Sequence, residues 1–255
     1  LPHRLLFAPI TKASVDAASG DPGTTVADAL RAAREGVPGP VHVDVSPAVT
    51  GRAREAPGSS SGPVTQAQRP APSAALPSTV RDLLTAARRQ VLLAGLGART
   101  AATAAALRAL ADTRHVPALV TYKAKGVIPD THPWWAGVVT HGALERPLLE
   151  QADLFVAVGF DPVELLPRAW PYRAPVVTLD AWPLAQTQVP VAVAAVGALP
   201  ALLEDATTAL GASTWTAPEI AAFAGAHRDA MRIETASGAL HPHDVVAIVA
   251  EHYAG

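Results

Sequence analysis

The sequence has 255 residues, of which 49% are hydrophobic, and a formal net charge of −2 at pH 7. This near-neutral balance gives no electrostatic reason to expect nucleic acid or an anionic membrane surface as a partner. Cysteine is absent, which excludes disulfides and cysteine-based metal sites.

The apolar runs are too short and the start is unlike a leader peptide. No run approaches the roughly 20 apolar residues that cross a bilayer, and the N-terminus lacks a basic segment followed by an apolar one. We therefore expect a cytoplasmic protein without a membrane partner. Because the sequence begins with Leu1 rather than methionine, we expect it to be a fragment, with trimming of a start methionine or a tag as the alternative.

Residues 1–51 predict one α/β unit. After a loop-like start, the sequence favours a helix over residues 25–35, with Thr24 as its candidate cap. The Pro-Gly-Pro sequence at 38–40 stops this helix, and the alternating valines that follow predict a strand. Such a unit is too small to fold alone.

Residues 52–76 change composition abruptly. They are rich in glycine, serine and proline and contain hardly any large apolar residue. Such a segment cannot offset its own ordering entropy by burial, so we expect a linker at a domain boundary.

Residues 77–211 alternate between helical and strand patterns. Ser78 is the candidate cap of the first helix. The strands lack polar alternation, which indicates burial on both faces, as in a parallel sheet covered by helices. The segment therefore predicts an α/β, Rossmann-like, doubly wound and mostly parallel sheet. We expect helices over 79–89, 101–112, 143–151 and 199–210, and strands over 91–94, 118–121, 154–158, 176–179 and 191–196.

Residues 212–255 predict two helical segments. An irregular helical connector covers 215–235, with Thr216 or Pro218 near its start. An amphipathic helix then runs to about Tyr253.

The most suggestive local motif is the glycine turn that follows the strand at 91–94. Gly95 and Gly97 lie between a strand and a helix, where backbone amides can face an anionic group. The motif is not a complete G-x-G-x-x-G, and a tight strand-to-helix turn in any α/β domain also requires glycine.

Two aspartates follow other predicted strands. Asp180 ends one strand, where a carboxylate can accept hydrogen bonds from ribose hydroxyls, although it can equally cap the next turn. Asp161 also follows a strand end, and its alternative is an Asx-Pro turn in which the side chain bonds its own backbone.

The remaining polar residues form no catalytic or metal-binding pattern. Lys123 and Lys125 flank a bend and suit phosphate contact or plain solvation. No histidine has a partner at metal-binding spacing, and no G-x-S-x-G nucleophile motif occurs. We predict no metal site and no catalytic residue in this chain.

Several motifs, taken in order, resemble one enzyme superfamily. The segments are 7–12, 33–45, 91–99, 121–133, Gly137, 152–159, 177–180 and 240–246. The first two are similar to the end of the pyrimidine-binding domain of thiamine diphosphate enzymes of the acetolactate synthase and pyruvate oxidase type. The middle group resembles their central domain, and the last segment resembles the helix that opens their diphosphate-binding domain. The resemblance thus divides the chain into 1–51, the linker 52–76, the central domain 77–211, and the connector and helix 212–255.

Within the superfamily, Gly159–Trp170 is the most discriminating segment. It resembles the catabolic acetolactate synthases, which have Asp-Pro, glutamate, proline and tryptophan here. The flavin-dependent biosynthetic branch instead has an arginine- and aspartate-rich turn that contacts FAD. The resemblance therefore favours acetolactate synthase-like carboligation, with a related 2-oxo acid decarboxylase or acyltransferase as its neighbour.

The resemblance implies chemistry that is carried out by the cofactor. In the family, a glutamate of the first domain promotes ylid formation on thiamine diphosphate, the ylid attacks a 2-oxo acid, and carbon dioxide leaves. A Gly-Asp-Gly motif followed by asparagine holds Mg²⁺ and the diphosphate in the third domain. Neither motif occurs in this chain, so we expect it to be inactive alone.

In relatives, the central domain holds FAD, ADP, an effector or nothing. The positions that match family contacts are Gly95, Gly97, Arg99, Thr121, His141, Asp161 and Asp180. The resemblance further implies a 2-oxo acid substrate and a homodimer or homotetramer for the parent enzyme. The alternative from another class is a non-catalytic Rossmann-like module that binds a nucleotide or serves as a scaffold.

Overall fold

A computed structural model describes residues 2–50, 75–184, 188–231 and 240–253. The predicted linker 52–76 lies outside these ranges except for its last two residues. The chain divides into two compact units, Leu1–Pro72 and Ser73–Gly255, and each is described by itself.

The first unit is a β-α-β arrangement. Strands β1 (Ala13–Asp16) and β2 (Val41–Asp44) pair in parallel, and α2 (Pro22–Arg34) connects them. Shorter helical segments are α1 (His3–Phe7), η1 (Ala8–Ile10), η2 (Ala17–Ser19) and α3 (Pro47–Thr50). The loop-like start predicted for this region is therefore wrong, because α1 and β1 occupy it.

The predicted cap of α2 is also wrong. Asp21 is the N-cap, and its carboxylate accepts a hydrogen bond from the amide of Thr24 at 2.7 Å. Pro22 provides the first helical position, where proline's missing N–H costs nothing. The helix therefore begins three residues earlier than the threonine pattern indicates.

The second unit contains a six-stranded, fully parallel sheet. Its strands are β3 (Gln90–Ala94), β4 (Ala118–Val120), β5 (Trp135–Val138), β6 (Leu154–Val158), β7 (Val176–Asp180) and β8 (Val191–Val196). Their order is β5-β4-β3-β6-β7-β8, the order of a doubly wound dinucleotide-binding sheet. The predicted fold class is confirmed.

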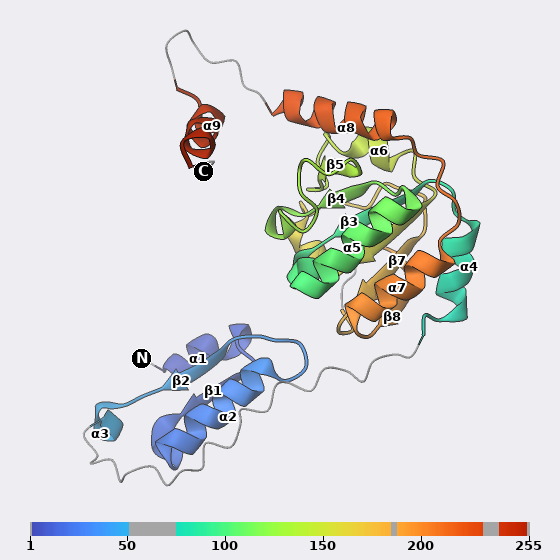
Figure 1. The fold of residues 1–255 in the computed structure, drawn as a ribbon. Coiled ribbons are helices and arrows are strands. Elements are labelled where there is room, and N and C mark those ends of the chain that lie inside the picture. The colour runs from blue at the N-terminus through green and yellow to red at the C-terminus, as the bar shows by residue number, and fades with distance from the viewer. Residues whose placement is uncertain (1, 51–74, 185–187, 232–239, 254–255) are drawn as a thin grey trace. The chain divides into compact units, whose positions relative to one another are not determined.

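Helices cover one face of the sheet and its β5 edge (Figure 1). The two longer helices α5 (Ala101–Arg114) and α7 (Leu199–Ala209) pack against each other, and α4 (Ser78–Ala86) packs against α7. Helix α8 (Ala217–Ala230) packs on β5, which is an edge strand of the sheet. The remaining segments are the short turns η3 (Leu96–Arg99), η4 (Tyr122–Ala124), α6 (Arg146–Leu149) and η5 (Pro162–Glu164), and the helix α9 (Pro242–Tyr253).

Three local predictions in the second unit need correction. Strand β5 is not among the strands that the sequence predicts. The helix predicted over 143–151 is shorter in the structure and consists of α6 alone. The Glu145 carboxylate accepts hydrogen bonds from the amides of Thr140 and Gly142, and this turn replaces the start of the predicted helix. Ser78 does not cap α4 with its side chain, since Pro77 is the N-cap.

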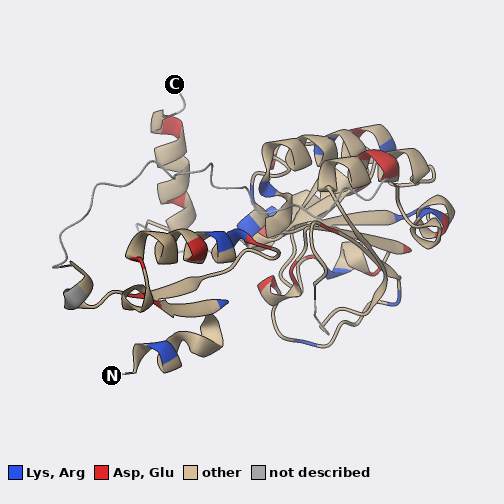
Figure 2. Cartoon of the chain, turned by 90° about the horizontal axis from the view of Figure 1, so that it is seen from below, with Lys and Arg blue, Asp and Glu red and all other residues tan. Residues whose placement is uncertain are grey.

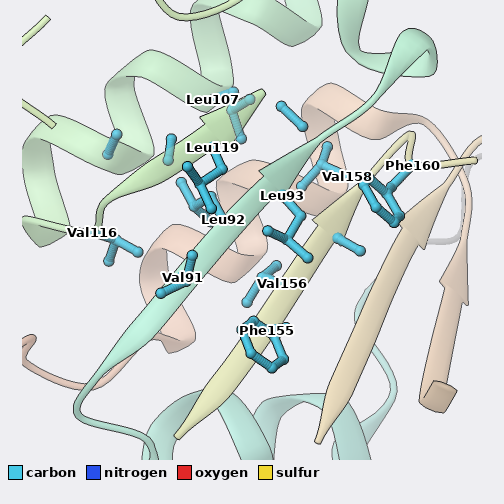
Figure 3. Close-up of a cluster of buried hydrophobic side chains, with 14 of the residues drawn as sticks. Val91, Leu92, Leu93, Leu107, Val116, Leu119, Phe155, Val156, Val158 and Phe160 are labelled. Carbon is cyan, nitrogen blue, oxygen red and sulfur yellow. The ribbon is translucent and has the colours of Figure 1, made fainter. Parts of the chain in front are cut away.

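The core lies between the sheet and its helices. Figure 3 shows Leu92 and Leu93 of β3 beside Val156 of β6, with Leu107 of α5 in the same cluster. All four side chains are fully buried. Burial of each such side chain contributes about 1.5–3 kcal/mol, so the apolar runs that predict the strands also hold the sheet together.

Charged residues are almost absent from the six strands. Figure 2 shows charged residues on the helices and connecting loops rather than on the sheet, and Asp180 is the one exception among the residues of these strands. None of the helices in the described part of the chain is both long and apolar enough to cross a bilayer.

Candidate functional site

The strand order reverses between β3 and β6. The chain leaves these neighbouring strands toward opposite sides of the sheet, and ligands of open α/β folds bind in the crevice outside the carboxyl ends at such a point. The predicted site residues all follow or end strands of this sheet: Gly95, Gly97 and Arg99 after β3, Thr121 after β4, His141 after β5, Asp161 after β6 and Asp180 at the end of β7. The candidate site is this edge.

Two backbone turns cross tightly at the reversal. A Cβ on Gly97 would lie 2.8 Å from the Cα of Gly159, and a Cβ on Gly95 would collide with the Gly159 carbonyl. Gly159 itself has a φ of +52°, which side chains disfavour. Packing of the β3 turn against the β6 turn therefore accounts for these glycines, as the tight-turn alternative expects.

Asp180 is a buried carboxyl group at this edge. It is 5% exposed. Burial raises its pKa to about 7; hydrogen bonding from the Thr178 hydroxyl and the Phe160 amide opposes this shift, and the nearby Asp161 charge adds to it. Asp180, Thr178 and Trp182 also line an otherwise mostly apolar cavity of about 180 Å³.

Asp161 caps the turn that follows β6. Its carboxylate accepts a hydrogen bond from the amide of Val163 at 3.1 Å, and η5 begins at the next residue. The structure thus shows the Asx-Pro turn that was the alternative for this residue. The charge of Asp161 nevertheless contributes to the raised pKa of Asp180.

Thr121, His141 and Arg99 have separate surroundings. Thr121 is completely buried, and its hydroxyl has no hydrogen-bond partner among the described residues. His141 has a φ of +66°, and its Nδ1 lies 3.3 Å from the Leu166 carbonyl in an aromatic cluster that includes Trp170. Arg99 is exposed at the end of η3. The structure therefore brings Gly95 and Gly97 together and Asp161 near Asp180, while His141 belongs to a different cluster.

The lysines near the bend after β4 are at the surface. Lys125 forms an ion pair with Asp130 at 2.6 Å, and Lys123 lies over the Tyr122 ring. Both ammonium groups are thus placed as solvated surface charges. Within the described ranges, no three histidine, aspartate or glutamate side chains gather into a potential metal site.

Two buried glutamates at this edge were not among the predicted site residues. Glu145 is 2% exposed and accepts hydrogen bonds from the amides of Thr140 and Gly142 at 2.9 and 2.8 Å. Glu164 is 4% exposed and accepts one from the amide of Leu96 at 3.1 Å. Glu164 lies in the discriminating segment 159–170, but its partner is 68 residues away, so no local pattern indicates the contact.

Comparison with known proteins gives a consistent result. The family model for the central domain of thiamine pyrophosphate enzymes matches residues 78–206. The chain is similar to the acetolactate synthase isozyme 1 large subunit of Escherichia coli K12, with 32% identity over 139 residues, covering 52% of this chain and 24% of that protein. It is similar to the catabolic acetolactate synthase of Raoultella terrigena, with 29% identity over 174 residues, covering 65% and 30%. The oxalyl-CoA decarboxylase of Escherichia coli K12 is 27% identical over 233 residues, covering 88% and 39%.

Proposed function

The chain belongs to the thiamine pyrophosphate enzymes, whose central domain it contains, and on this premise we propose that it is part of an acetolactate synthase-like 2-oxo acid decarboxylase and carboligase. Family membership confirms the resemblance seen in the sequence. The observation that carries the finer proposal is the similarity to acetolactate synthases of two types. The matched regions span less than two fifths of the relatives' lengths, so activity, substrate and partners of the whole protein belong to the proposal.

The described residues of this chain do not fit thiamine diphosphate or its Mg²⁺. Mg²⁺ requires a cluster of oxygen ligands, and the described side chains offer no group of three acidic or histidine ligands. A diphosphate group requires free amide donors or cations, whereas the amide of Leu96 at the glycine turn is already bonded to Glu164. We therefore propose that this central domain supports the enzyme's architecture and that other parts of the parent protein hold the cofactor.

The segment after β6 supports the acetolactate synthase-like proposal without FAD. Residues 162–164 form the short turn η5, and Trp170 packs against Phe155 and Tyr172. An ordered aromatic cluster thus occupies the part of the chain where the flavin-dependent relatives have their arginine-rich turn. FAD is accordingly not part of the proposed function.

The whole reading frame that contains this chain provides the test. Upstream of this chain, we expect it to encode the first-domain glutamate that promotes ylid formation in the family. Downstream, we expect the Gly-Asp-Gly motif followed by asparagine that holds Mg²⁺ and the diphosphate. The purified full-length protein should be a homodimer or homotetramer. It should release carbon dioxide from pyruvate and form acetolactate only with thiamine diphosphate and Mg²⁺. In the cell we propose that it is cytoplasmic. The apoprotein in chelator is the control. A full-length protein that binds the cofactor but turns over no 2-oxo acid would contradict the proposed activity.

The second candidate is a non-catalytic Rossmann-like module for nucleotide binding or assembly. One observation favours it: the sheet and its helices form a compact unit with a continuous core of their own. A reading frame that lacks both cofactor motifs would select this candidate over the enzyme.

A further inference from the structure

Four consecutive backbone amides in the turn after β3 all donate hydrogen bonds within the protein. Gly95 donates to the Val158 carbonyl at 3.0 Å and Gly97 to the Gly159 carbonyl at 2.9 Å. Ala98 donates to the Gly95 carbonyl at 3.0 Å. Glycine turns that bind phosphate leave such amides free to point at the ligand. This turn, as folded, offers none of the four.

The fourth amide, that of Leu96, donates to a side chain instead of a carbonyl. Its acceptor is Oε1 of Glu164, at 3.1 Å. Glu164 is 4% exposed, and its Oε2 is buried without a hydrogen-bond partner among the described residues. A carboxylate that accepts from a backbone amide forms the same charge-assisted hydrogen bond that a bound phosphate forms there.

The charge of Asp161 works in the same direction. Asp161 precedes η5, three residues before Glu164, and its charge contributes to the raised pKa of the neighbouring Asp180. The buried charge of Glu164 repels an incoming anion more strongly than exposed charges attract it, because water screens the exposed ones. The cations of the neighbouring turns, Arg99 and Lys123, are exposed.

We propose that Glu164 is an internal anion in the phosphate position of the glycine turn, and that it makes this crevice select against nucleotides such as ADP and FAD. Glu164 is thus a specificity-determining residue of the central domain. The inference concerns only the ligand of this domain and holds whether or not the proposed activity is correct.

Removal of the carboxylate provides the first test. Glu164→Ala exposes the Leu96 amide, and Glu164→Gln removes the charge while keeping an acceptor oxygen. We expect Glu164→Ala to unfold at a lower temperature than the wild type and to regain stability in inorganic phosphate but not in chloride of equal ionic strength, since ligands that bind the folded state stabilise it. ADP, measured by calorimetry, should bind both variants at least about tenfold more tightly than the wild type.

Glu204→Gln is the matched control, because Glu204 is an exposed glutamate on α7. It should respond to phosphate and ADP as the wild type does. Equal ADP affinity in the wild type and both Glu164 variants would overturn the proposal, and so would a Glu164→Ala protein that phosphate does not stabilise.

A measurement on the wild type covers the case in which the variants do not fold. In amide nuclear magnetic resonance spectra, inorganic phosphate at neutral pH should leave the Leu96 and Gly97 signals in place. A saturable shift of these two signals with phosphate would show that the turn accepts anions, and the proposal would be wrong.

Discussion

At the scale of single residues, Gly97 tests whether close packing explains the glycine turn. Its Cα hydrogen faces the backbone of Gly159, and an added Cβ would lie 2.8 Å from that residue's Cα. Because the obstacle is backbone rather than a flexible side chain, Gly97→Ala should lower the free energy of unfolding by about 1–3 kcal/mol. Urea denaturation measures this change.

Gly225→Ala is the matched control for Gly97. Gly225 lies within α8, and nothing stands within 4 Å of its added Cβ. Alanine should therefore leave stability unchanged or raise it by about 0.5–1 kcal/mol. If both substitutions had the same effect, the tight crossing of the two turns would not be what requires glycine at position 97.

Asp180 should make stability depend on pH in a characteristic direction. Its pKa is about 7 in the folded protein, above the usual 3.8 of an aspartate, with burial as the main cause. Between pH 4 and 7 the unfolded chain therefore loses this proton before the folded one, and the folded state becomes less stable as pH rises. Asp180→Asn abolishes this loss, so relative to the wild type it should gain on the order of 2–4 kcal/mol between about pH 4 and pH 8.

Denaturation curves of wild type and Asp180→Asn at several pH values provide the measurement. The comparison cancels the other titrating groups, which both proteins share. A stability difference that stays constant from pH 4 to pH 8 would mean that Asp180 titrates normally and that its burial does not raise its pKa.

The candidate site could be predicted from the sequence only in part. Gly95 and Gly97 stand out because glycine after an apolar strand is a local signal, and Asp161 and Asp180 stand out because they follow strand ends. The contact between Glu164 and the Leu96 amide joins residues 68 positions apart, so only the crossing of two turns in the folded sheet reveals it. The bonds of the Gly95 and Gly97 amides to β6 and its turn also appear only in the folded sheet, whereas the Ala98 amide bonds within its own turn.

At the scale of elements, α8 is held to the sheet by its beginning. Thr216 and Glu219 form a reciprocal capping box, in which the Glu219 carboxylate accepts from the Thr216 amide at 2.9 Å. The preceding Trp215 donates its indole N–H to the Gln90 carbonyl of β3 at 2.9 Å, and Arg89 lies over its ring. The start of α8 is therefore fastened to the start of β3, while its body covers the edge strand β5.

Loss of the capping box should loosen α8. Thr216→Ala should cost about 1 kcal/mol of stability and speed hydrogen exchange of amides in α8 and β5. Thr216→Ala and Glu219→Ala should be less than additive in the double variant, because each removes the same reciprocal pair. Thr208→Ala, on exposed surface of α7, removes a hydroxyl that is not a cap and is the control. Additive effects would show that the box does not act as a unit.

The elements differ in how well their sequences predict them. Strands β3, β6 and β8 are uninterrupted apolar runs, so their positions follow from composition. The sequence pattern does not predict strand β5, because Trp135–Val138 is only four residues long and lies among prolines and glycines. The sequence pattern does not predict the shortening of α6, because the local hydrogen bonds from the amides of Thr140 and Gly142 to the Glu145 carboxylate compete with helix formation.

At the scale of the whole molecule, the similarity to one relative extends over both compact units of the chain. The match to the oxalyl-CoA decarboxylase covers 88% of this chain and therefore reaches into both units. The family model, in contrast, matches residues 78–206 within the second unit alone. The part of the chain that the family model recognises is therefore the parallel sheet with its helices.

We predict that the 255-residue chain does not bind thiamine diphosphate. Its sequence contains no Gly-Asp-Gly motif, and the described side chains offer no cluster of ligands for Mg²⁺. The amides of the turn after β3 already have partners, so this turn gives a diphosphate no free donor. Calorimetric titration with thiamine diphosphate and Mg²⁺ should give only the heat of dilution, and the same titration in chelator should be indistinguishable. The full-length protein, under identical conditions, should show saturable binding that requires Mg²⁺. Saturable, Mg²⁺-dependent binding by the 255-residue chain would contradict the prediction and place a cofactor site within these two units.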